Sequence, residues 1–373
     1  MSRGARIHPL TTANRKLFGG LTIGVGVLLS VAGAFGLLSF YVHWARVTHQ
    51  NVARYIRERA VVQQLFIDPS FERLMAAISY STSDTFSTTW DFDRGISLSK
   101  KLFLPTPMFG EMKYRYRPNV GVYNIAVWSG LHFRHFAIPA TPEISGLLQQ
   151  ADVVHQIHFE TDDYGFKPTE FDVRGESFKV FFLGDSFTEG LWVDPKDTFV
   201  NLFGKELKTD GVALTPVNLG VNGYGALEEE WMLEFFAPQL HPKLAIVSLF
   251  PNDVHEDYFK VIKNVGIPAE NYTHMFGYLH RAEDFCEKHD IKLVISLVPV
   301  KEQLGPLKNF TFFQDRVKAW CAEAHIMCID SMPYLTRFGA DHVYFSWDPH
   351  LSVEGHRHYT DFLYQELKPL LHH

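Results

Sequence analysis

The sequence of 373 residues is poor in cysteine, and the three that it has are Cys286, Cys321 and Cys328. An odd, sparse set at these spacings excludes a disulfide framework and a cysteine-based zinc site. Cys321 and Cys328 can pair, but we expect buried free thiols, and the cysteines do not define the cellular compartment. The chain also lacks internal repeats and low-complexity segments, which excludes a repeat protein.

An excess of positive charge is missing too, since 42 Asp and Glu residues outnumber 35 Lys and Arg residues. The first 45 residues hold four of the basic residues and no acidic one. The remainder therefore has 31 basic residues (35 − 4) against 42 acidic ones, a net charge of −11. An acidic body argues against a nucleic-acid partner. The 46% of hydrophobic residues, with 32 Phe, are enough for a large aromatic-rich core.

The segment from Leu17 to Val42 has no charged residue and no Pro, Asn or Gln. As a helix it extends ~39 Å, more than the ~30 Å of a bilayer's hydrocarbon core. Tyr41 and Trp44 suit an aromatic anchor at the membrane interface. A cleaved signal peptide needs an apolar stretch of only ~7–15 residues. The pattern therefore predicts a permanent, single-pass transmembrane helix over residues 17–45.

Basic residues flank this helix at both ends in nearly equal number, so charge alone does not fix its orientation. We expect the N-terminus in the cytoplasm and the main domain outside it, in the periplasm. Gly20, Gly24, Ala32 and Gly36 form small-x-x-x-small notches that let another helix approach closely. Glycine is also common in membrane helices without such contacts. The helix is thus either a simple lipid anchor or a packing partner for other transmembrane helices of a complex.

The pattern divides the chain into four regions. A basic tail (1–16) and the transmembrane helix (17–45) precede a juxtamembrane region (46–160) with a helix and irregular or extended segments, and the main domain covers 161–373. His155 and His158 in the juxtamembrane region are spaced like metal ligands on a helix. Their surroundings look extended, so their side chains point to opposite faces, and structural histidines are favoured. The pair His132 and His135 is interpreted in the same way.

After Phe178, apolar runs alternate with amphipathic segments. Continuous apolar strands with helical crossovers predict a parallel sheet covered on both faces. The expected strands are Lys179–Leu183, Thr215–Leu219, Leu244–Leu249, Lys292–Leu297 and Ile326–Ile329. The expected helices are Thr198–Leu207, Leu227–Phe236, Tyr272–Lys288, Phe313–Ala324 and Ser352–Leu367.

In such a sheet the functional residues gather beyond the carboxyl ends of the strands. The first strand is followed by Gly-Asp-Ser (184–186), the second by NLGVNGYG (218–225) and the third by FPND (250–253). WDPHLSVEGH (347–356) precedes the last helix. The four loops offer a hydroxyl, a glycine-rich backbone, a carboxamide and an Asp/His pair.

This set of groups suits acyl transfer by a serine. Ser186 needs a histidine to take its proton and a carboxylate to orient that histidine, and His350 and Asp348 supply both. The oxyanion of the tetrahedral intermediate needs fixed donors, each contributing ~3–4 kcal/mol. The N–H groups of Ser186 and Gly220 and the side-chain amide of Asn252 are the expected donors.

On these residues the chain resembles the SGNH/GDSL hydrolase superfamily. Ser186 in GDSFTEG, Gly220, Asn252 and His350 match the four blocks of that superfamily, and the lead-in TDDYGFKPTEF extends the resemblance from Thr161 to the C-terminus. The resemblance implies an α/β fold, a flavodoxin-like three-layer α/β/α sandwich with a parallel sheet. It also implies ester hydrolysis or acyl transfer without a metal or organic cofactor.

Two features depart from the superfamily pattern. Asp348 and His350 are separated by one residue instead of the usual two, and His356 and His358 are the alternative bases. Both alternatives are otherwise expected as surface residues of the last helix. Phe250-Pro251 replaces the usual glycine before the Asn-Asp pair, which predicts a narrower pocket there.

Two functions fit these observations. The first is a membrane-anchored serine esterase or O-acyltransferase that acts on acyl esters, with envelope glycans as substrates on family analogy. The second is an SGNH-like structural subunit of a larger membrane assembly, with weak or no activity, which the glycine notches favour. The intact four-block set favours the enzyme. The acyl group and the acceptor do not follow from the sequence.

Overall fold

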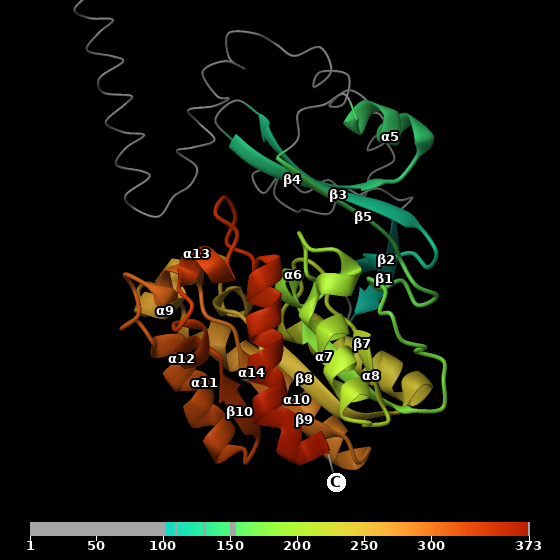
Figure 1. Ribbon diagram of the computed structural model, residues 1–373. Helices are drawn as coiled ribbons and strands as arrows, with labels where there is room; N and C mark the ends of the chain where they lie inside the picture. Colours follow the sequence, from blue (N-terminus) through green and yellow to red (C-terminus); the bar gives the residue numbers. More distant parts are fainter. Residues whose placement is uncertain (1–101, 109–110, 130–131, 150–153, 372–373) are drawn as a thin grey trace, which may run out of the picture. The chain divides into compact units, whose positions relative to one another are not determined.

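The computed structural model describes residues 102–108, 111–129, 132–149 and 154–371 (Figure 1). All of them lie within one compact unit, Phe66–His373. The predicted transmembrane segment and its four small residues lie outside the described residues. Within the described ranges, no helix is both long and apolar enough to cross a membrane.

A five-stranded parallel sheet forms the centre of the main domain, in the order β10-β9-β8-β6-β7. All five predicted strands are present, with ends shifted by at most two residues. Their bounds are β6 Phe178–Gly184, β7 Leu214–Asn218, β8 Pro242–Leu249, β9 Lys292–Leu297 and β10 Met327–Asp330. This is the flavodoxin-like order, and the direction of the connections reverses at β6 and β8. The crevice at the carboxyl ends of β6 and β8 is therefore where a substrate is expected.

Helices cover both faces of this sheet (Figure 1). The connection from β6 to β7 runs toward one edge and the later ones run toward the other, so right-handed crossovers place their helices on opposite faces. Accordingly α7 packs against α14, and α8 packs against α10. The long helices are α7 Phe199–Thr209, α8 Ala226–Leu240, α10 Ala269–Lys288, α11 Phe312–Glu323 and α14 Val353–Leu371. The short ones are α6 Ser186–Glu189, η3 Pro195–Asp197, η4 Pro251–Asp253, α9 Tyr258–Lys263, η5 Lys301–Leu304, α12 Met332–Leu335 and α13 Ala340–Val343.

The described residues between 102 and 160 form two antiparallel sheets. One is the hairpin of β1 and β2, and the other has the order β4-β3-β5. The bounds are β1 Phe103–Met108, β2 Glu111–Tyr116, β3 Gly121–Ser129, β4 His132–Pro139, α5 Pro142–Leu148 and β5 His155–Glu160. We call residues 102–160 the small β-region.

The two histidines of β5 have separate contacts. Nε2 of His155 is 2.8 Å from the carbonyl oxygen of Trp192. The ring of His158 lies 4.7 Å from that of Tyr123. Both side chains thus have structural neighbours of their own, as alternation along a strand requires.

Candidate active site

The strand β6 ends in a tight turn that presents Ser186. Asp185 caps the short helix α6 by accepting the N–H of Phe187 at 2.9 Å, and Ser186 is the first residue of that helix. A side chain at Gly184 does not fit, because its Cβ would lie 2.2 Å from Thr188 Oγ1 and 3.2 Å from the carbonyl oxygen of Ser248. Glycine therefore lets the helix start directly at the end of the strand.

The structure brings Ser186 and His350 together from positions 164 residues apart. Oγ of Ser186 lies 2.7 Å from Nε2 of His350. On the other side of the ring, Nδ1 of His350 forms a short hydrogen bond with Oδ1 of Asp348. The order hydroxyl, imidazole, carboxylate is the geometry that lets a histidine take a proton from a serine.

The single residue between Asp348 and His350 is explained by a local turn. Oδ1 of Asp348 accepts the backbone N–H of His350 at 2.9 Å in addition to its ring Nδ1. A carboxylate that accepts from the backbone two residues later is an Asx-turn. The turn folds the carboxylate back over the ring, so two intervening residues are not needed.

The charges around His350 favour its protonated form. Burial lowers the pKa of His350, but Asp348, through its charge and hydrogen bond, then Asp185 and then Glu189 together raise that pKa above its ordinary value. Burial raises the pKa of Asp185, and the hydrogen bond from Asn252 lowers it. A raised histidine pKa strengthens a general base and stabilises the imidazolium that it becomes.

The three predicted oxyanion donors have different surroundings. Nδ2 of Asn252 donates to Oδ2 of Asp185 at 2.9 Å and has a second hydrogen that no described residue accepts. Ser186 is the first residue of helix α6, so its N–H group has no acceptor within that helix. The N–H of Gly220 instead donates to Oδ1 of Asn218 at 3.0 Å. The expected role of Gly220 as a donor to substrate stays a prediction.

The structure gives Gly220 a packing role that the sequence argument missed. A Cβ at this position would lie 2.2 Å from the backbone nitrogen of Glu189 and 2.5 Å from the carbonyl carbon of Thr188. The loop after β7 thus lies directly on the backbone of α6, and only glycine allows this distance.

Phe250 is buried behind Phe187, the aromatic residue that follows Ser186. It is 3% exposed, and its ring stacks on that of Phe187 at 4.2 Å. Phe187 in turn lies 4.8 Å from the ring of His350. Phe250, in place of the usual glycine, therefore supports Phe187, whose ring is the apolar neighbour of the imidazole.

Comparison with protein families identifies the domain. Residues 182–358 match the model of the GDSL-like Lipase/Acylhydrolase family. This part of the chain belongs to that family. The resemblance stated from the sequence is thereby confirmed over residues 182–358. We call the predicted main domain that contains them, 161–373, the GDSL-like domain. No curated protein sequence matches the chain.

Three solved structures match part of the chain. The crystal structure of TesA is 18% identical and covers 52% of this chain and 99% of its own, with a TM-score of 0.43. The psychrotrophic esterase EstA from Pseudoalteromonas sp. is 13% identical over 52% of this chain and 99% of its own, with a TM-score of 0.41. A member of the lipolytic protein G-D-S-L family from Veillonella parvula is 18% identical. The match covers 51% of this chain and 98% of that one, with a TM-score of 0.39.

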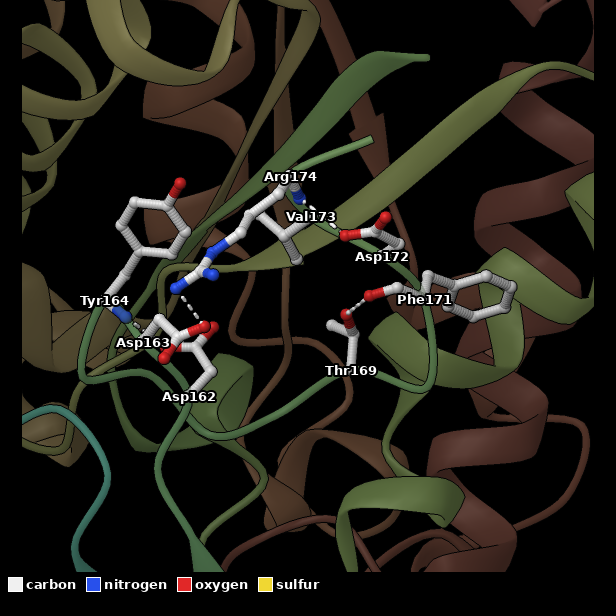
Figure 2. Close-up of a pocket in the computed structure, with 8 residues that line it drawn as sticks. All are labelled: Asp162, Asp163, Tyr164, Thr169, Phe171, Asp172, Val173 and Arg174. Atoms are coloured by element: carbon white, nitrogen blue, oxygen red, sulfur yellow. Dashed lines mark hydrogen bonds and ion pairs between the residues drawn. The ribbon is translucent and has the colours of Figure 1, made fainter. Parts of the chain in front are cut away.

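A shallow pocket of the GDSL-like domain lies apart from the catalytic residues. In it Arg174 forms an ion pair with Asp163, and the backbone N–H of Arg174 donates to Asp172 at 2.9 Å (Figure 2). None of Ser186, His350 and Asp348 is among its lining residues. Those residues are Asp162, Asp163, Tyr164, Thr169, Phe171, Asp172, Val173 and Arg174.

The two alternative histidines lie on α14, and neither contacts Ser186 in the described structure. His356 is buried, contrary to the expected surface position, and its Nδ1 accepts the backbone N–H of Phe199 at 3.1 Å. His358 stacks on Phe338 with ring centroids 3.5 Å apart. The sequence placed His356 on the correct helix, but the direction of a side chain on a helix depends on what packs there.

His356 is expected to make the protein sensitive to acid. Burial, then Lys167 and His350, lower its pKa to about 3. Between about pH 3 and pH 6.5 the unfolded chain binds a proton at His356 that the folded chain does not, so the free energy of unfolding falls as the pH falls. From pH 7 to pH 5 this loss is at most about 2 kcal/mol. Urea unfolding at both pH values measures it.

The matched variants for this prediction are His356→Gln and His274→Gln, the latter at an exposed position of α10. The first should flatten the pH dependence by most of that amount and the second should leave it unchanged. Equal pH dependence of H356Q and wild type would contradict the prediction.

Proposed function

We propose that the protein is a serine esterase or O-acyltransferase that acts on acyl esters through Ser186, His350 and Asp348. The observation that carries the proposal is the hydrogen-bonded series from Ser186 Oγ through both ring nitrogens of His350 to Asp348. The membership of residues 182–358 in a family of lipases and acylhydrolases supports the same chemistry.

The reaction follows from this geometry. His350 Nε2 takes the proton of Ser186 as the hydroxyl attacks the ester carbonyl, and the imidazolium then gives that proton to the leaving alcohol. Asn252 and the N–H of Ser186 are the donors best placed to stabilise the oxyanion. In the second half of the reaction, His350 takes a proton from water or from a sugar hydroxyl as its oxygen attacks the acyl-serine ester. The imidazolium then returns the proton to Ser186 Oγ as the free acid or the acylated sugar leaves.

The proposal includes a membrane anchor on sequence grounds. The charge-free segment Leu17–Val42 suits an anchor that holds the GDSL-like domain in the periplasm, where acyl esters of envelope glycans are available. The small residues of this segment suit contact with other transmembrane helices of a complex.

Reaction of the full-length protein with a fluorophosphonate tests the serine mechanism. We expect a single labelled site, which peptide mass spectrometry assigns to Ser186, because only a serine with an adjacent base attacks such a reagent rapidly. Transfer is distinguished from hydrolysis by adding a sugar acceptor and measuring acylated sugar against free acid. No labelling at Ser186, with no turnover of p-nitrophenyl acetate, would favour the structural-subunit alternative.

A further inference from the structure

Glu189, the last residue of helix α6, is fully buried three residues after Ser186. Its carboxylate accepts hydrogen bonds from three separate parts of the chain. The hydroxyl of Tyr116 in β2 donates to Oε1 at 3.2 Å, and Nδ2 of Asn124 in β3 donates to the same oxygen at 3.4 Å. The backbone N–H of Asn222, in the loop after β7, donates to Oε2 at 2.8 Å.

A buried lysine accompanies this carboxylate. Lys167 is 1% exposed, and its Nζ donates to the carbonyl oxygens of Gly190 and Val193 at 2.5 Å each. Burial raises the pKa of Glu189, and the charge of Lys167 lowers it. An isolated buried charge is costly, so each of the two groups makes the burial of the other tolerable.

We propose that Glu189 is a positioning residue that ties the small β-region and the loop after β7 to the helix that carries Ser186. The inference rests on the proposed serine hydrolase function. Through Asn222, Glu189 fixes the loop that contains Gly220. Through Tyr116 and Asn124, it fixes α6 against the two sheets of the small β-region. Nothing in the four-block pattern assigns this residue a role.

Glu189 also acts on the catalytic histidine through its charge. It is one of three carboxylates whose charges raise the pKa of His350, after Asp348 and Asp185. A neutral side chain of the same size would add to the burial of His350, which lowers its pKa, and would not raise that pKa through charge. The charged and titratable groups that bear on Glu189 and His350 are Lys167, Tyr116, Asp348, Asp185 and His356.

The test compares Glu189→Gln with Glu323→Gln in the full-length protein. Glutamine at position 189 keeps an oxygen for Asn222 and removes the charge. E323Q removes the same charge from an exposed residue of α11 that takes no part in the hydrogen bonds of Glu189. For E189Q we expect the acid limb of kcat/KM for p-nitrophenyl acetate to move to lower pH by about half a unit. We also expect kcat to fall about tenfold, because a neutral acceptor holds Asn222 more weakly. E323Q should match wild type in both.

A second variant separates positioning from stability. E189Q removes one of the two carboxylate charges that favour the protonated form of Lys167, the other being Asp194, and adding Lys167→Met removes the lysine charge itself. We expect E189Q to have a lower Tm than wild type. The E189Q/K167M double variant should regain most of that difference and keep the acid limb at the lower pH of E189Q. An E189Q acid limb that coincides with that of wild type, or a double variant with wild-type kcat, overturns the proposal.

If E189Q alone does not fold, the double variant gives the same measurement, and a double variant that also fails to fold makes Glu189 purely structural and overturns the proposal. Failure of the proposed function is distinct from these outcomes, because it appears as a wild-type protein without turnover or labelling.

Discussion

Replacing Ser186 with alanine is expected to lower kcat for a small ester by at least about 10⁴-fold and to leave Tm within a degree or two of wild type. The loss is large because no other group can form the acyl-enzyme, and precedents for removing a triad member are of this size. The fold should tolerate the change because the side chain gives only a hydroxyl, bonded to His350. Steady-state kinetics and thermal unfolding measure the two quantities.

Ser346→Ala is the matched control, since this exposed serine is close to Asp348 in sequence but outside the triad. It should keep wild-type kcat. An S186A variant that keeps a tenth or more of the activity rules out the serine mechanism. One that unfolds shows instead that the hydroxyl is structural.

Replacing Asp348 with asparagine should lower kcat by about 10³- to 10⁴-fold without disturbing the loop. Both hydrogen bonds from His350 end on one oxygen of Asp348, and an amide oxygen can accept both. The variant therefore keeps the turn but loses the charge that stabilises the imidazolium. If the amide rotates, its N–H₂ faces Nδ1 and forces the proton onto Nε2, which then cannot accept from Ser186.

The D348N substitution should also move the acid limb of the pH–activity profile. Activity rises with pH as His350 loses its proton, and Asp348 raises the pKa of His350, so the acid limb of D348N should lie at lower pH than that of wild type. Asp361→Asn, on the exposed face of α14, is the control and should leave the profile unchanged. A D348N variant with wild-type kcat would show that Asp348 does not assist His350.

The sequence predicts the central sheet well, because long apolar runs between amphipathic helices permit little else. It also places Ser186 and Asn252 at one edge of the sheet, because parallel strands end at the same edge. His350 follows α13 instead, and the loop before α14 brings it to Ser186. The small β-region was harder to predict, because its strands mix polar and apolar residues instead of forming the continuous apolar runs of the central sheet. Glu189 and Lys167 look like ordinary surface charges in the sequence, and only tertiary contacts show that they are buried. The direction of the Gly220 N–H depends on backbone angles that no residue type fixes.

The Asx-turn between Asp348 and His350 makes the carboxylate and the imidazole a single rigid unit. Because the carboxylate holds both the backbone and the ring of the same histidine, a displacement of this loop carries the pair along without changing its internal geometry. One distance, from Ser186 Oγ to His350 Nε2, then decides whether the serine is activated. A small movement of this loop can therefore end and restore the activation of Ser186 while the hydrogen bonds between Asp348 and His350 stay intact.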